Sequence, residues 1–195
     1  VGDSAQSLAA AQTFGQRVMQ LPPAWRTRTL DDWSARERVW SEAFRPWMRR
    51  VAEASTWVTS GAAAAVGMVA GGTVDALARL GVSPASALVQ IADYDVAHAL
   101  RGDKPAPVSV SAARLEELPL IVAQPDGVVW DRDTQTLIYL RRLGGGRADA
   151  ITAREHLETR SVQTRGMRGW WVRSATEVDE TSYRGTRYVR IRWWE

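Results

Sequence analysis

The hydrophobic pattern of this chain changes its period near residue 127, and this change constrains the fold more than any other feature. Before it, apolar residues recur at intervals of three and four, the spacing of one face of an α-helix. After it, short runs rich in β-branched and aromatic residues are separated by turn residues, as in strands. Helices followed by antiparallel strands predict an α+β fold.

Two helices are expected in the first part of the chain. The first ends near Met19, before Pro22-Pro23. The second begins at a Thr29 cap, and Pro46 should kink or divide it. Its apolar residues form one stripe, which predicts burial against the rest of the chain or in the apolar groove of a partner. The stripe consists of Trp33, Trp40, Phe44, Trp47, Val51, Ala54 and Val58.

Short segments separated by glycine and proline follow, and most of them fit helices. Residues 84–91 fit either a strand or a helix. The expected helices are Ala62–Val69, Val74–Leu80 after a Thr73 cap, Asp93–Leu100, and one that starts at Ser109 or Ser111 and runs through Leu118.

The C-terminal part predicts strands. Residues 127–142 form a hairpin signal, in which two β-rich runs flank polar turn residues. Gly144–Gly146 is expected to be a flexible loop, since it lacks the spacing of a phosphate-binding loop. Ser161–Thr164 is a weak strand and Trp170–Arg173 a strong one. In Arg187–Trp193, arginine alternates with apolar residues, which predicts one buried and one basic, solvated face.

Charge is divided unevenly along the chain. Residues 132–195 carry 13 arginines and 8 acidic residues, whereas residues 1–131 have a net charge of −2. The basic half contains no lysine, and guanidinium groups favour bidentate contacts with phosphate. Nucleic acid is therefore one expected partner, and an arginine-rich composition without functional meaning is the alternative. The candidate nucleic-acid-binding residues are Arg141, Arg142, Arg187, Arg190 and Arg192.

Several classes of site are disfavoured by composition. The chain has no cysteine, which excludes disulfides and thiolate sites. Its two histidines, His98 and His156, are too few for a histidine-rich metal site. We expect no cofactor and no metal. No apolar run reaches the roughly 18 residues of a membrane span, so no membrane span is expected.

The segment from about Ala62 to Leu140 resembles the phage Mu F-type minor head proteins. The resemblance rests on the order and spacing of its pieces, which are more specific than any one of them. The pieces are GAAAAVGMV at 61–69, Leu80–Val82, Ser86–Ile91, Asp93–Lys104, Leu118–Leu120, Gln124–Asp131 and Thr136–Leu140.

The C-terminal domain of that family is similar to the barnase, EndoU, colicin E5/D and RelE group of metal-independent ribonucleases. The resemblance implies helices packed on a twisted antiparallel sheet, and it divides the chain into a helical extension at residues 1–60 and a ribonuclease-like domain at 61–195. It also implies a virion component near the head or portal vertex, present in the host cytoplasm during assembly. Other head or portal proteins, and the packaged genome, are the implied partners.

Two classes of function remain open at this stage. One is a structural or ejected component of the virion, and the other is a metal-independent endoribonuclease or toxin carried in the particle. Such an enzyme needs a general base, a general acid and cations around the phosphorane. The resemblance points to His98, followed by Arg101 and Lys104, with Tyr139 and Thr164 as partners on the sheet. The alternative is that His98 packs or caps its helix.

Overall fold

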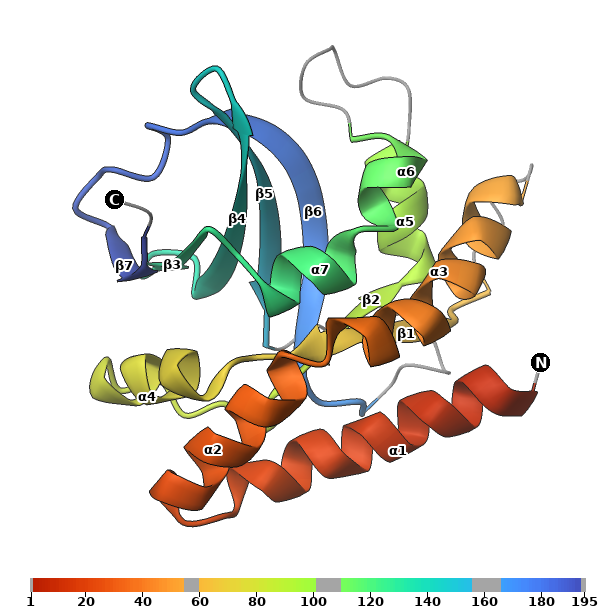
Figure 1. The fold of residues 1–195 in the computed structure, drawn as a ribbon, viewed down its shortest axis with the longest axis horizontal. Coiled ribbons are helices and arrows are strands. Elements are labelled where there is room, and N and C mark those ends of the chain that lie inside the picture. The colour runs from red at the N-terminus through yellow and green to blue at the C-terminus, as the bar shows by residue number, and fades with distance from the viewer. Residues whose placement is uncertain (1, 55–59, 101–109, 156–165, 194–195) are drawn as a thin grey trace.

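The computed structural model confirms the α+β fold and describes residues 2–54, 60–100, 110–155 and 166–193 (Figure 1). The described helices are α1 (Gly2–Met19), α2 (Pro23–Ser34), α3 (Glu37–Glu53), α4 (Gly71–Arg79), α5 (Asp93–Leu100), α6 (Ala112–Leu115) and α7 (Leu118–Ala123). The described strands are β1 (Ala63–Met68), β2 (Leu88–Ala92), β3 (Gly127–Asp131), β4 (Thr136–Gly144), β5 (Arg147–Arg154), β6 (Trp170–Asp179) and β7 (Tyr188–Arg192).

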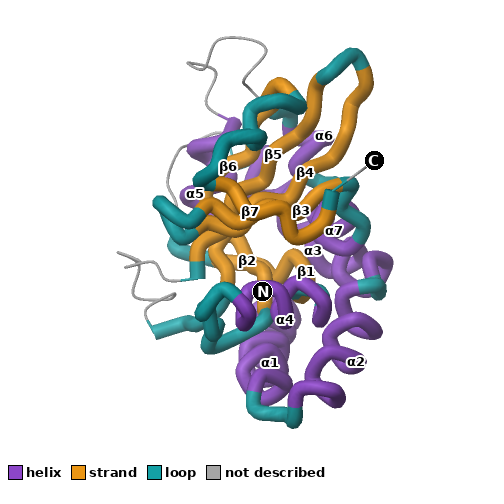
Figure 2. Tube along the Cα trace, turned by 90° about the vertical axis from the view of Figure 1, so that its left-hand side faces the viewer, coloured by secondary structure: helices purple, strands orange, loops and turns teal. Residues whose placement is uncertain are grey.

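These strands form one seven-stranded sheet in the order β1-β2-β6-β5-β4-β3-β7. Strands β3 to β6 make an antiparallel meander, and the only parallel pairing within the described sheet joins β2 to β6. The expected hairpin at 127–142 is confirmed, because β3 pairs with β4 from Gly127↔Leu140 to Asp131↔Thr136. Strand β7 lies at one edge of the sheet, beside β3, and β1 lies at the other (Figure 2).

The N-terminal helices differ from the expectation in their boundaries. Helix α1 ends at Met19 as predicted, but α2 begins at Pro23 rather than at a Thr29 cap. Proline favours the first helical position, because its missing N–H has no intrahelical acceptor there. The chain divides at Arg36, whose ψ of 50° is not helical, whereas α3 continues through Pro46. At the break, the Trp33 carbonyl accepts hydrogen bonds from the Arg36 N–H at 3.3 Å and from the Trp40 indole at 3.0 Å.

The aromatic part of the stripe packs within this chain, as one of its two expected arrangements requires, whereas Ala54 at its end is exposed and Val58 lies outside the described residues. Trp40 and Trp47 are 7% and 6% exposed and Phe44 is fully buried. Trp33 packs against Phe14 of α1 with ring centroids 4.9 Å apart. Helix α3 thereby contacts β1, α5 and α7, and the N-terminal helices share one hydrophobic core with the rest of the fold.

The small-residue helix expected at Ala62–Val69 is wrong, because residues 63–68 form strand β1. Alanine favours helices, but pairing with β2 and burial override this weak preference. Gly67 lies where a Cβ would approach Val122 of α7 to 3.1 Å, so the small residues allow α7 to pack closely on the strand. The ambiguous segment 84–91 resolves into β2, which starts at Leu88.

The remaining short helices form where the sequence predicts them but differ in some of their boundaries. Helix α5 has the expected bounds, and α4 begins at Gly71 instead of after a Thr73 cap. Ser111 caps α6, since its side chain accepts a hydrogen bond from the Arg114 N–H. The helix expected through Leu118 is divided into α6 and α7.

The two faces of the meander differ in what covers them. On one side, which we call the helix face, the sheet packs against α5 and α7 in the main core (Figure 1). The other side, which we call the β7 face, carries a smaller cluster of Val129, Ile138, Leu140 and Ala150. No helix covers this cluster among the described residues, and the side chains that pack on it are Val178, Tyr183, Tyr188 and Trp193.

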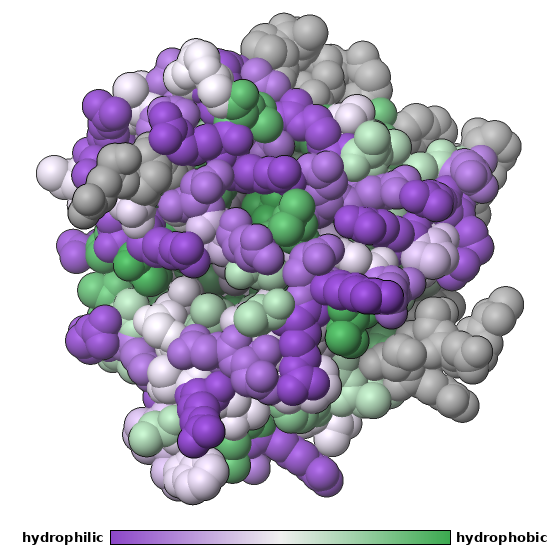
Figure 3. Space-filling view, in the orientation of Figure 1, coloured by the Kyte–Doolittle hydropathy of each residue, from purple (hydrophilic) through white to green (hydrophobic). Residues whose placement is uncertain are grey.

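The surface seen from the helix-bearing side is mainly hydrophilic, and its hydrophobic residues form separate small areas (Figure 3). None of the described helices is both long enough and apolar enough to span a bilayer.

Candidate nucleic-acid interface

Two of the five candidate arginines form the basic surface that the alternating pattern predicts. Arg190 and Arg192 are both exposed on edge strand β7, and residues two apart on a strand point to the same side. That side is the β7 face, because Arg190 pairs with Val129 of the smaller cluster. No carboxylate within the described part of the chain forms an ion pair with either guanidinium. The prediction of a solvated basic face on this strand is confirmed.

Aromatic rings are interleaved with these arginines. The Arg190 guanidinium lies 4.6 Å from the ring centre of Trp193, and the Arg187 guanidinium lies 4.6 Å from that of Tyr188. Tyr183 meets Tyr188 edge to face with centroids 5.1 Å apart. These contacts hold flexible arginine side chains in defined positions, and each stabilises the surface by about 0.5–1 kcal/mol.

Arg187 is held by a carboxylate that the strand places beneath it. Its Nη2 donates to Asp131 Oδ2 at 2.6 Å, and Asp131 also accepts from the Thr134 hydroxyl at 2.8 Å and from the Asp133 N–H at 3.0 Å. Burial alone would raise the pKa of Asp131, but hydrogen bonds from Thr134, Asp133 and Arg187 outweigh it and hold this pKa below its usual value. Asp131 is therefore ionised and occupied by donors within the protein.

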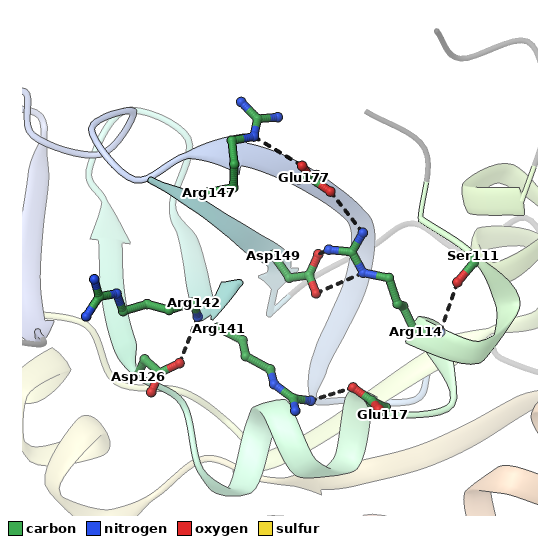
Figure 4. A network of polar contacts seen from close by, with 9 residues as sticks. All are labelled: Ser111, Arg114, Glu117, Asp126, Arg141, Arg142, Arg147, Asp149 and Glu177. Carbon is green, nitrogen blue, oxygen red and sulfur yellow. Dashed lines mark hydrogen bonds and ion pairs between the residues drawn. The ribbon is translucent and has the colours of Figure 1, made fainter. Parts of the chain in front are cut away.

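Arg141 and Arg142 lie near the far end of β4, and the guanidinium of each is paired with a carboxylate. Figure 4 shows the pair of Arg141 with Glu117. Arg141 forms an ion pair with Glu117, next to α7, and Arg142 Nε donates to Glu180 at 3.0 Å. Their charges are balanced locally, so they add less to a basic surface than Arg190 and Arg192 do.

A network that the sequence did not indicate lies between α6 and the helix face (Figure 4). Arg114 of α6 forms a two-pronged contact with Asp149 of β5 and donates to Glu177 of β6 at 3.0 Å. Glu177 also accepts from Arg147 at 3.1 Å. Burial raises the pKa of Asp149, and the charge of Arg114 opposes that rise. Asp149 and Glu177 are direct cross-strand neighbours, so Arg114 offsets a repulsion between like charges.

His98 lies on α5, half-buried, with its ring stacked parallel to that of Tyr94 at a centroid distance of 6.5 Å. Its Nδ1 is buried and has no hydrogen-bond partner. Asp95, one turn earlier, forms an ion pair of 3.1 Å with Arg173 of β6. Burial, opposed by the charge of Arg173 and assisted by that of Asp93, raises the pKa of Asp95 to about 6.

The other candidate catalytic residues do not join His98 within the described chain. Arg101, Lys104 and Thr164 lie outside the described residues, as does His156. Tyr139 on β4 is 2% exposed, its hydroxyl has no hydrogen-bond partner, and burial raises its pKa well above the usual value. Helix α5 packs against α3, β2 and β6, whereas β4 lies two strands beyond β6. A buried neutral phenol in this position is core rather than an accessible acid.

Metal chemistry has no visible basis in the described residues, where no group of three or more histidine, aspartate or glutamate side chains could hold an ion. Comparison with protein-family models, with curated proteins and with solved structures finds no match to this chain. The fold class and the geometry of the β7 face are therefore the basis for the proposals below.

Proposed function

We propose that this chain is a virion component of the minor head class that contacts nucleic acid through its β7 face. The observation that carries the nucleic-acid part is the pair Arg190 and Arg192. Both are exposed, both point to the β7 face, and neither has a carboxylate partner within the described residues. Arg114, Arg141, Arg142, Arg147 and Arg187, in contrast, all pair with acidic side chains.

Nucleic acid fits this surface better than an acidic protein does. Tyr188 and Trp193 lie against the arginines here. Aromatic rings provide stacking platforms for bases, while guanidinium groups follow the phosphates. The half of the chain that forms this surface carries the excess of arginine over acidic residues. Since the surface offers exposed guanidinium groups on an edge strand, which suit phosphates, the contact should depend on the nucleic-acid backbone rather than the base sequence.

The virion part of the proposal is supported by the order of motifs between Ala62 and Leu140, which resembles the minor head proteins. The fold class expected from that resemblance, helices packed on an antiparallel sheet, is the one this chain has. A fold by itself does not establish a function, so the proposal depends on the order of the motifs and on the charge of β7.

The nucleic-acid part is tested by the salt dependence of binding. Fluorescence anisotropy with labelled single-stranded oligonucleotides should show affinity that falls steeply between about 50 and about 200 mM salt. The double variant Arg190→Gln with Arg192→Gln should reduce the slope of log K against log salt by about 1.4, or roughly 0.7 for each lost phosphate contact.

The matched control is Arg28→Gln with Arg79→Gln, which removes two exposed arginines from α2 and α4. An equal loss of binding in both double variants would show that net charge alone drives binding and would contradict a specific β7 face.

The virion part is tested by probing purified phage particles with an antibody to this chain. Absence of the chain from particles would overturn that part.

The endoribonuclease is retained as a second candidate because of one observation at His98. Its ring is half-buried, and its Nδ1 has no partner to fix it in a structural role. Incubation of the wild type with RNA and a chelator should give cleavage that falls by roughly 10²-fold in His98→Ala. Absence of cleavage by the wild type would exclude this candidate.

A further inference from the structure

A row of polar side chains crosses the β7 face at the level of the β3–β4 turn. Register pairs place Tyr188 opposite Asp131, Asp131 opposite Thr136, and Arg154 opposite Trp171. The row is joined across β4 and β5, because Arg154 Nε donates to the Thr136 hydroxyl at 2.9 Å. It therefore runs across five adjacent strands, from β7 to β6.

Arg154 is the residue of this row with free donors. Its side chain is exposed, and its one hydrogen bond uses Nε, so both Nη groups have no partner among the described residues. The hydroxyl of Thr136, which is 4% exposed, holds the guanidinium in place at its Nε. A guanidinium held at Nε with two outward nitrogens presents the planar fork that matches a phosphate group.

Further donors surround Arg154 on the same face. The indole of Trp171, its cross-strand neighbour, is 1% exposed, so it can report on a ligand at Arg154 without contacting that ligand. Two residues earlier on β5, the Thr152 hydroxyl lies 2.7 Å from that of Ser174.

The acidic groups near this row are already engaged. Asp131 accepts hydrogen bonds from Thr134, Asp133 and Arg187, and the hydroxyl of Thr134 lies 2.9 Å from that of Thr136. Glu155 accepts a hydrogen bond from the Ala85 N–H. The charge of Arg154 is thus not cancelled by an ion pair within the described residues.

We infer that Arg154, held by Thr136 and flanked by the hydroxyls of Thr152 and Ser174, forms a phosphate-binding subsite. The inference rests on the proposed function and extends it, since the phosphate would be a diester of the bound nucleic acid. Strands β7 and β5 are three strand spacings apart, about 14 Å, so one nucleic-acid strand can meet Arg190 and Arg154 together.

The test compares Arg154→Gln and Arg154→Lys with the wild type and with Arg28→Gln, an exposed arginine on α2. Binding of a labelled single-stranded oligonucleotide is measured against salt. We expect Arg154→Gln to reduce the slope of log K against log salt by about 0.7. Arg154→Lys should keep that slope but bind more weakly, because an ammonium group cannot form the bidentate contact. Arg28→Gln should change neither.

A second arm titrates inorganic phosphate into ¹⁵N-labelled protein, with the Trp171 indole signal assigned through Trp171→Phe. The subsite predicts a shift of this signal in the wild type and its loss in Arg154→Gln. If phosphate shifts the signal but the oligonucleotide does not bind, the subsite stands and the proposed function falls. If the oligonucleotide binds equally well to wild type and Arg154→Gln, or if neither ligand shifts the signal, the subsite is overturned.

Discussion

Replacing Arg114 with methionine should destabilise this protein far more than replacing Arg147, although both arginines contact Glu177. Arg114 has a side chain 28% exposed and satisfies Asp149, which is 3% exposed, as well as Glu177. Arg147 is 34% exposed and makes one contact of 3.1 Å. Removing one partner of a buried pair leaves an uncompensated charge and costs about 3–5 kcal/mol. A peripheral pair contributes about 0–1 kcal/mol.

The loss of folding stability in Arg114→Met should also depend on pH. Burial already raises the pKa of Asp149, and Arg114 opposes that rise, so its removal raises this pKa further. A carboxyl group with a raised pKa in the folded state keeps a proton that the unfolded chain has released. Stability is then lost as pH rises from about 3.9 toward the folded pKa. The deficit relative to the wild type should therefore be larger at pH 8 than at pH 5.

Urea denaturation of the wild type, Arg114→Met and Arg147→Met at both pH values measures these differences. The double variant Arg114→Met with Asp149→Asn should recover part of the loss, because it removes the unpaired buried charge. Equal stabilities for the two single variants, or an Arg114→Met deficit that does not change with pH, would refute this reasoning.

Two further predictions concern the core and helix α5. Trp40→Ala should lower the free energy of unfolding by about 3–5 kcal/mol, because the side chain is 7% exposed within the core. Trp25→Ala, at a residue 65% exposed, should change it by less than about 0.5 kcal/mol, and similar losses in both would contradict the assigned burial. For Asp95, the pKa of about 6 lies above the unfolded value, so wild-type stability should fall as pH rises from about 4 to about 6. That fall, on the order of 2–3 kcal/mol at most, should be absent in Asp95→Asn, and persistence of the full slope in this variant would assign it to other groups.

The sequence predicts those parts of the fold that local patterns determine. The hairpin at 127–142 follows from two β-rich runs around a polar turn, and the aromatic stripe follows from helical spacing. The alternation of Arg190 and Arg192 with apolar residues correctly predicts their common solvated side. In each of these cases the residues that decide the outcome are close together in the chain.

Other features depend on contacts between distant residues. Residues 63–68 are rich in alanine and form a strand only because β2 and the helices around it bury them. Strand β5 was not predicted, because Ala148, Ala150 and Ala153 give a weak β signal and two flanking strands hold it in place. Arg114 lies 35 and 63 positions from its partners Asp149 and Glu177, so no local pattern reveals their network.

The same distinction applies to the candidate sites. Local alternation identified Arg190 and Arg192, but the row through Arg154 depends on the register of five strands. The sequence suggests Tyr139 as a catalytic partner because it lies on a predicted strand, within the segment that resembles the minor head proteins. The structure places it with Leu137 on the buried side of β4, where a phenol has no access to substrate.

Ultraviolet cross-linking of the protein to a single-stranded oligonucleotide, followed by mass spectrometry, tests the central claim most directly. The account predicts cross-links concentrated at Tyr188 and Trp193, because these partly exposed rings lie on the β7 face beside Arg190. Cross-links confined to Trp25 or Trp33 on the N-terminal helices would contradict it and would place the nucleic acid away from the sheet.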